Sequence, residues 1–173
     1  MTSDPATSSA KPGGPGPSEQ ASLLETARGV LEQASFAALA TLAPGGFPFA
    51  SLVALAPSED GGGPVLLLSR LAVHTRNLAG DPRASLLILG ATGASGEDLL
   101  AGPRLTLTGT VVSVGRDVVT RARFLAHHPE AAGYVDFADF GFYRLRPTAV
   151  HLVAGFGRIG DIPPAALLGP TRS

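Results

Sequence analysis

The chain has 173 residues, of which 45% are hydrophobic and 16% charged, with a formal net charge of −1. This length suits a single domain, and the near-neutral charge argues against a nucleic-acid-binding protein, which usually carries a basic patch. No apolar run reaches the roughly 18 residues of a membrane span, and the lack of cysteine excludes disulfides and cysteine-based metal sites.

The first segment, 1–17, is rich in Pro, Gly, Ser and Thr and has no apolar stretch typical of a signal peptide. Such a composition buries too little apolar surface to offset chain entropy, so we expect a disordered tail in a cytoplasmic protein. Ser18 can cap a helix, and apolar residues then recur at helical spacing up to Ala34. The spacing predicts a helix over about 19–34.

The next part of the chain predicts an antiparallel meander. Apolar, β-prone runs at 36–42, 47–56 and 65–69 are separated by short stretches rich in Gly, Pro and polar residues. Because the run at 65–69 is continuously apolar, we expect it to be buried on both faces.

A short helix over 71–78 and a strand over 83–89 follow, and 90–103 reads as a mobile loop. The segment 104–114 alternates apolar and polar residues almost perfectly, which is the strongest strand signal in the chain. A helix is predicted over 117–128, with a further helical turn from Pro129 to Ala132.

The chain is predicted to finish its sheet with strands at 142–145 and 150–154, and to fray over 166–173. About seven strands with helices inserted between them do not fit a doubly wound parallel sheet, which needs regular strand–helix alternation. We therefore expect a mainly antiparallel α+β fold, a β-barrel with inserted helices, formed as one domain over 18–165.

The glycines at 155, 157 and 160 match the G-x-G-x-x-G dinucleotide fingerprint. That fingerprint requires a helix opening at its third glycine, whereas Pro163 and Pro164 stand where the helix would run. These glycines are better explained by a bend of the final strand or a close backbone approach.

A possible phosphate site follows the buried strand at 65–69. The strand ends in a serine, and a short helix then begins among neutral and cationic hydrogen-bond donors: Ser69, Arg70, His74, Thr75, Arg76 and Asn77. Helix N-termini offer unpaired N–H groups to anions, but short polar residues also cap helices that bind nothing. The residues alone leave both interpretations open.

Four blocks in order carry a resemblance: SRLAVHTRNLAGDPRASLL at 69–87, PRLTLTG at 103–109, YVDFADFGFYRL at 134–145 and HLVAGFGR at 151–158. The chain resembles the pyridoxamine-5′-phosphate-oxidase-like FMN-binding split-barrel family, and within it the branch of the heme-utilisation proteins. The resemblance implies a split β-barrel and a homodimer with FMN sites in the grooves between the two chains.

Residue by residue, the resemblance places Ser51, Leu52 and Val53 against the flavin and ribityl chain, and the donors at 69–77 around the phosphate. It implies an FMN-dependent oxidoreductase that passes hydride or electrons between a reduced donor and a small-molecule acceptor. The authentic oxidases end in a block with a tryptophan that clamps the vitamin substrate. The chain has no tryptophan, so B6 oxidase activity is not expected.

The heme-degrading members of the branch suggest a second interpretation, in which the protein binds or degrades heme. His151 would be the axial iron ligand, and Asp136 and Asp139 would orient its imidazole. A purely structural histidine on a strand, a cofactor-binding protein without turnover, and a deazaflavin (F420) in place of FMN remain open alternatives.

Overall fold

The structure, a computed structural model, describes residues 16–57, 60–91, 98, 100–155 and 157–169. Its elements in chain order are α1 (Pro17–Gln33), β1 (Phe36–Leu42), β2 (Pro48–Ala56), β3 (Val65–Ser69), α2 (Val73–Gly80), β4 (Arg83–Leu89), β5 (Arg104–Val114), α3 (Val118–His127), a 3₁₀ turn (Pro129–Gly133), β6 (Phe140–Val153), β7 (Ile159–Asp161) and α4 (Pro164–Leu168). Within these residues, no helix is long and apolar enough to cross a membrane.

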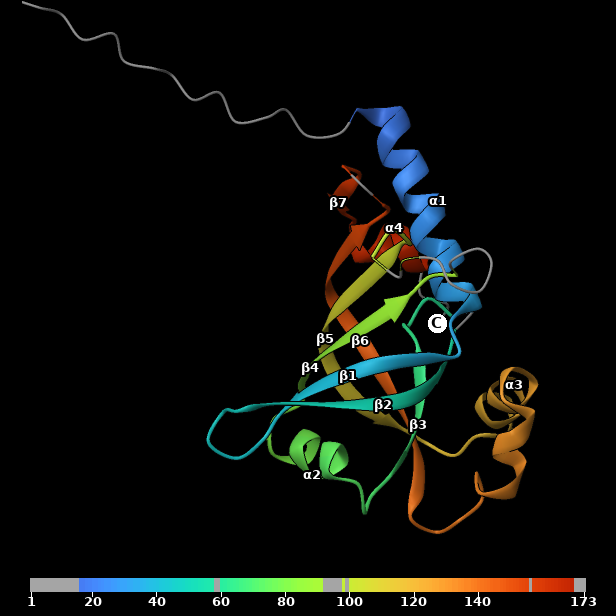
Figure 1. Cartoon of the computed structure of the whole chain (residues 1–173). Helices are drawn as coiled ribbons and strands as arrows, with labels where there is room; N and C mark the ends of the chain where they lie inside the picture. The colour runs from blue at the N-terminus through green and yellow to red at the C-terminus, as the bar shows by residue number, and fades with distance from the viewer. Residues whose placement is uncertain (1–15, 58–59, 92–97, 99, 156, 170–173) are drawn as a thin grey trace, which may run out of the picture.

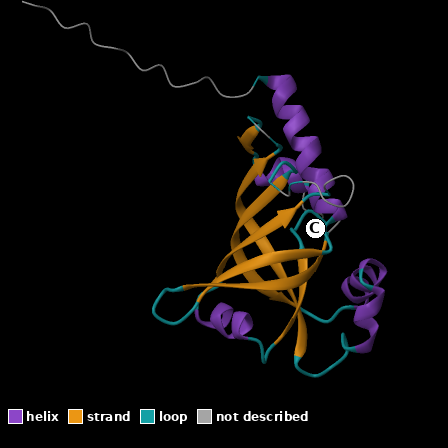
Figure 2. Cartoon of the chain, in the orientation of Figure 1, coloured by secondary structure: helices purple, strands orange, loops and turns teal. Residues whose placement is uncertain are grey.

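The strands form one antiparallel sheet in the order β3-β2-β1-β4-β5-β6-β7, and β3 also pairs with β6. This extra pairing closes β1 to β6 into a six-stranded barrel, visible in Figures 1 and 2. The long β6 pairs with β3 through its first five residues and with β7 through its last three. The fold is therefore the antiparallel split β-barrel that the sequence predicts.

The barrel interior is filled by alternate residues of each strand, as the two-residue period of a β-strand requires. The innermost side chains are fully buried aliphatic groups, contributed by every barrel strand: Leu39, Leu55, Leu66, Leu86, Leu105, Leu107, Leu145 and Leu152. The alternation predicted over 104–114 is confirmed, because every apolar position of β5 up to Val111 is buried.

Helices close the two ends of the barrel and cover one side (Figure 1). At one end, α1 packs its buried Leu23, Ala27 and Val30 into the core cluster. At the other end, α2 lies below β1 and β2. On the side, Phe124 of α3 stacks on His128, with ring centroids 4.9 Å apart.

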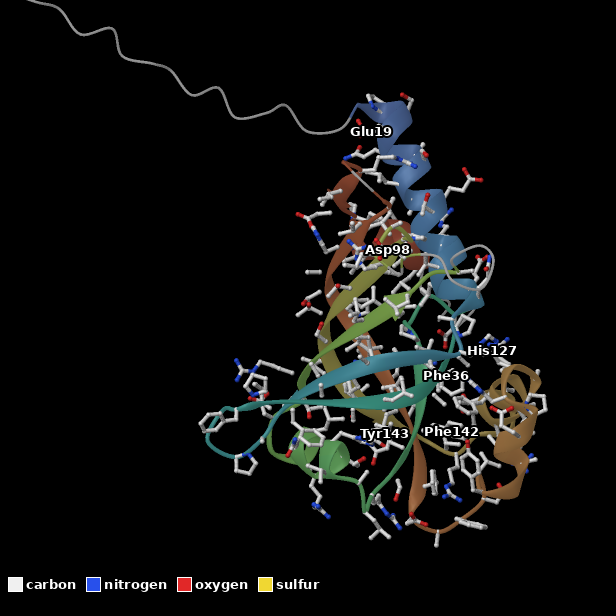
Figure 3. All side chains as sticks on the ribbon, in the orientation of Figure 1. Glu19, Phe36, Asp98, His127, Phe142 and Tyr143 are labelled. Carbon is white, nitrogen blue, oxygen red and sulfur yellow. The ribbon has the colours of Figure 1, made fainter. Side chains whose placement is uncertain are left out.

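The ring of Phe36, which is labelled in Figure 3 at the start of β1, lies 5.6 Å from that of His128. His128 is almost completely buried, and its ring nitrogens contact the carbonyl oxygen of Leu55 at 2.8 Å and the carboxylate of Glu130 at 2.9 Å. These contacts fix α3 on the barrel, so His128 is a structural residue.

Two helix boundaries differ from the predictions. The first helix begins at Pro17, with Gly16 rather than Ser18 at the capping position, because proline suits the first helical turn, where its missing N–H costs nothing. The helix predicted over 71–78 runs from Val73 to Gly80.

The C-terminal part differs more. The strands predicted at 142–145 and 150–154 are one strand, β6, which continues through Pro147. Its partner β5 accommodates this with a register shift between Thr108 and Gly109, where any side chain at 109 would collide with the backbone of Arg146. The short strand β7 was not predicted.

The predicted C-terminal boundary at residue 165 is too early, because α4 continues to Leu168 and buries Leu167 against the core cluster. Residues 1–15 of the predicted tail, residues 92–97 and 99 of the predicted loop, and the last residues, 170–173, lie outside the described residues. Their disorder and mobility stay predictions.

The glycine-rich segment at 155–160 forms the hairpin between β6 and β7. Gly155 and Gly157 have φ angles of +105° and +75°, which side chains disfavour, and the N–H of Ala154 donates to the carbonyl of Arg158. A Cβ at Gly160 would lie 2.8 Å from Leu23 of α1. The chain turns at these glycines, and the close approach at Gly160 is to a side chain rather than to another backbone.

Candidate cofactor-binding site

The start of the predicted phosphate segment is tied to the loop before β6. The hydroxyl of Ser69 donates to the carboxylate of Asp139 at 2.5 Å and accepts from the N–H of Leu71 at 3.1 Å. The N–H of Arg70 donates to the carbonyl of Asp139 at 2.7 Å. The hydroxyl assigned to the phosphate therefore already has an anionic partner.

The polar side chains of α2 point into the end of the barrel. His74 Nδ1 lies 3.0 Å from the hydroxyl of Ser51, and the amide of Asn77 donates to the hydroxyl of Thr41 at 3.0 Å. Ser51 and Thr41 alternate with the outward positions of β2 and β1 and so face the interior. These bonds make α2 a cap on the barrel end.

Two polar atoms of this cap, His74 Nε2 and Thr75 Oγ1, are buried without a partner. Burial lowers the pKa of His74 below its usual 6.5, which favours the neutral imidazole. The segment therefore offers a phosphate no positive charge from His74.

The remaining cations of the segment lie outside the cap. Arg70 and Arg76 are exposed, and their guanidinium groups donate to the carbonyls of Ala138 at 2.5 Å and Leu71 at 2.9 Å. The structure thus brings Ser51, His74, Thr75 and Asn77 together inside the barrel end, not around an open cradle. These residues fit the phosphate of FMN poorly.

The three residues predicted to meet the flavin lie on different faces of β2. Val53 is buried in the core and Ser51 faces α2, whereas the side chain of Leu52 is 75% exposed on the outside of the barrel. Only Leu52 is therefore placed on an outer surface where a flat ligand or a second chain could contact it.

Leu52 belongs to a row of residues that crosses the outer face of the barrel. Directly paired residues of neighbouring strands share a face, so the register defines this outer row as Leu52, Ala38, Leu87, Thr106, His151 and Asp161. The next row on one side consists of small, uncharged residues: Ala50, Ala40, Ser85, Thr108 and Ala149.

Two depressions lie along the outer row. A groove of about 480 Å³ is lined by apolar side chains that include Phe36, Leu52, Leu87 and Leu89. A hollow of about 390 Å³ at the other end of the row is lined by threonines and prolines together with His151 and Asp161. The outer face therefore offers apolar contact at one end and an imidazole at the other.

His151 is held by a carboxylate that sequence reasoning missed. Its Nδ1 lies 2.8 Å from Oδ1 of Asp161, and its side chain is about half exposed. Within the chain, Asp136 instead pairs with Arg121 and Asp139 accepts from Ser69. Asp161 would have been found only from the hairpin register, which places it opposite His151.

No group of three or more His, Cys, Asp or Glu side chains in the part of the chain that the structure describes could enclose a metal ion. An iron bound here would therefore need its other ligands from a macrocycle or from a second molecule. In that case His151 could serve as a single protein ligand of the iron, held by its carboxylate partner.

The family model described as "CREG, beta-barrel" matches residues 17–167. The chloroplastic heme oxygenase HOZ of Arabidopsis thaliana is 42% identical over 96 residues, which are 54% of this chain and 28% of that protein. The heme oxygenase HutZ of Vibrio cholerae is 30% identical over 101 residues, 56% of this chain and 57% of that protein. The chain thus matches less than two thirds of the length of either relative.

Among solved structures, a heme binding protein from Mycobacterium smegmatis is 36% identical, with a TM-score of 0.77 over 86% of this chain and 60% of that chain. A Clostridium acetobutylicum protein of the pyridoxinephosphate oxidase family, related to general stress protein 26, is 11% identical, with a TM-score of 0.62 over 82% of this chain and 94% of that chain. The second likeness concerns the fold alone.

Proposed function

The chain belongs to the CREG β-barrel family, and from this premise we propose that it binds heme as a homodimer, in the manner of a heme oxygenase. This order reverses the expectation from the sequence, in which FMN came first and heme second. The relatives whose names mention heme support the reversal, as does the poor fit of the segment 69–77 to a phosphate.

The observation that carries the proposal is the state of His151. An ionised carboxylate has no proton to donate and can only accept a hydrogen bond. The contact with Asp161 therefore keeps the proton of the neutral imidazole on Nδ1 and leaves the lone pair on Nε2. An imidazole held in this way is a typical iron ligand. Bound heme supplies an iron centre whose distal surroundings decide between storage of the group and activation of dioxygen.

Other residues of the outer face suit a porphyrin. Leu87 and Thr106 of the outer row give apolar contact beside the imidazole and reduce access of water. Arg104 pairs with Leu89 and Val153 in the row on the other side of the outer row, on the same face of the sheet. Its guanidinium can form a charge-assisted hydrogen bond with a heme propionate.

The outer face also suits a second copy of the chain. The outer row and the row that begins with Ala50 consist of small, aliphatic or hydroxyl side chains from β2 to β5, and neither has an Asp, Glu, Lys or Arg before Asp161. In a twofold dimer the same patch meets itself, and an uncharged patch does so without like-charge repulsion. The exposed Leu52 and Leu87 then become buried, which stabilises the dimer through the hydrophobic effect.

Titration of the purified protein with hemin and, separately, with FMN tests the cofactor. We expect saturable binding of one hemin per chain with a shifted Soret band, and loss of that shift in His151→Ala. His127→Ala is the matched control, because His127 contacts the carbonyl of Ala34, which borders the groove at the opposite end of the outer row from His151. Tight FMN binding without a Soret shift would instead support the flavoprotein interpretation.

Light scattering tests the dimer in the same samples. We expect a mass of twice the 17.5 kDa chain at micromolar concentration, with or without hemin. A stable monomer that still binds hemin would overturn the dimer while leaving the heme site in place.

A further inference from the structure

We propose that Asp161 is a positioning residue for the proposed heme site, and that it fixes the imidazole of His151 so that Nε2 faces the iron. The inference rests on the proposed function and assigns to Asp161 the role that the sequence analysis gave to Asp136 and Asp139. It concerns the contact between a residue of β6 and a residue of β7, and its failure can be distinguished from a failure of the proposed function.

His151 and Asp161 face each other across the pair of strands β6 and β7. His151 and Asp161 are direct partners in the β6–β7 register, and the contact between Nδ1 and Oδ1 is 2.8 Å. Two side chains at directly opposite positions share one face of the sheet. The carboxylate therefore restricts the rotation of the ring from within the sheet surface and also determines which nitrogen keeps its proton.

Strand β7 has only three residues, and contacts at both of its ends hold it in place. On one side the hairpin turn holds it, with Gly155 and Gly157 in left-handed conformations. On the other side the N–H of Ile162 donates to the carbonyl of Val150 at 3.0 Å, and the Ile162 side chain is buried. The backbone on either side of Asp161 is therefore fixed to β6.

Helix α1 adds a third constraint. Gly160 lies so close to Leu23 that a Cβ at this position would be 2.8 Å from its Cδ1. Leu23 is itself buried in the core cluster. The strand that carries Asp161 is thus pressed against the helix that closes the barrel, which favours a rigid carboxylate position over a mobile one.

The exposure of the Asp161 carboxylate limits how much its pairing with His151 stabilises the chain when nothing is bound. Its side chain is 88% exposed in the single chain, so water screens the charge and the free pair contributes little to stability. A ligand lying over the pair removes this screening, because water leaves the contact. The hydrogen bond to the carboxylate then holds the ring orientation and the proton on Nδ1, and a partner of this kind tunes the metal that a histidine binds.

The experiment compares Asp161→Asn, Asp161→Ala and Asp161→Glu with Asp136→Asn. We expect the first two to weaken hemin binding by roughly 10- to 100-fold, as loss of a ligand's hydrogen-bond partner commonly does, and to shift the Fe(III)/Fe(II) midpoint potential. Asp161→Glu keeps a carboxylate and should restore part of both effects. Asp136→Asn is the matched control, because Asp136 is an exposed carboxylate paired with Arg121.

Unchanged affinity and potential in Asp161→Asn, with binding lost in His151→Ala, would overturn this inference and leave the proposed function standing. Unchanged hemin binding in His151→Ala would overturn both the assigned ligand and the role of Asp161. Equal losses in Asp161→Asn and Asp136→Asn would also overturn the inference, since they would assign the effect to general surface charge. Circular dichroism of each variant checks that the barrel still folds.

Discussion

The barrel end closed by α2 and the outer face around His151 use histidine in opposite ways. His74 faces the interior and contacts Ser51, and burial lowers its pKa, which favours the neutral imidazole. His151 lies on the surface, and an exposed carboxylate engages one of its nitrogens. The comparison teaches that donors typical of a ligand site can instead bond to one another and close a fold, whereas a histidine on an outer strand can keep one ring nitrogen outside its contact with a carboxylate.

Among the substitutions that test this comparison, Leu52→Arg is expected to have the largest effect, which is loss of the proposed dimer. Leu52 is 75% exposed in the single chain, so the monomer should fold normally, whereas a twofold dimer would bury two unpaired cations at a cost of several kcal/mol. We expect a monomer in light scattering at micromolar concentration. Leu71→Arg is the matched control, because Leu71 is 72% exposed but precedes α2 rather than lying on the outer face. Dissociation of both variants would contradict the assignment of the interface.

Asn77→Ala is expected to have the next largest effect, on stability alone. Asn77 is 6% exposed and donates to Thr41, so its removal leaves a buried hydroxyl poorly satisfied. Such a loss costs about 1–3 kcal/mol, which is about 2–12 °C in melting temperature for a chain of this size. Calorimetry should show this drop with unchanged hemin affinity. A loss of cofactor affinity without a loss of stability would mean that α2 is a binding element after all.

The pH dependence of stability should report the burial of His74. Since its pKa is lowered from 6.5 in the folded chain, the unfolded chain binds more protons between the two pKa values. Stability is therefore expected to fall as the pH is lowered through 6.5 and below. His74→Gln should flatten this slope, measured as the melting temperature between pH 8 and pH 5. The same slope in the variant would assign the effect to other histidines.

Arg76→Ala should have the smallest effect. The side chain is exposed and donates to the carbonyl of Leu71, so we expect a change in unfolding free energy within about 0.5 kcal/mol and unchanged hemin affinity. A phosphate site at 69–77 predicts a different result, a fall in FMN affinity of roughly 10- to 150-fold. Fluorescence titration with FMN separates the two outcomes.

The sequence was most informative where a local pattern decides the structure. Alternation over 104–114 predicted β5 correctly, because the two faces of one strand differ in burial. Turn residues and apolar runs likewise located β1, β3 and β4, whose bounds agree with the predicted ranges.

The sequence was least informative where a long-range contact decides. β7 has three residues and no alternation, and it exists because it pairs with β6. For the same reason the pair of His151 and Asp161 could not be predicted, since it depends on the register of a hairpin. The donor types at 69–77 suggested a phosphate site, but they do not reveal that His74 faces Ser51 while Ser69 bonds to Asp139.

The closure of the barrel by β3 and β6 has a consequence for folding. The pairing joins Val65–Ser69 to Phe140–Arg144, segments that are far apart in the chain. Contacts of such long range form slowly, because the chain segment between the two strands must first lose conformational freedom. Until the last third of the chain has been synthesised, the apolar strand β3 has one edge without its partner. An unpaired apolar edge favours aggregation, so the newly made chain is most vulnerable in the interval before β6 leaves the ribosome.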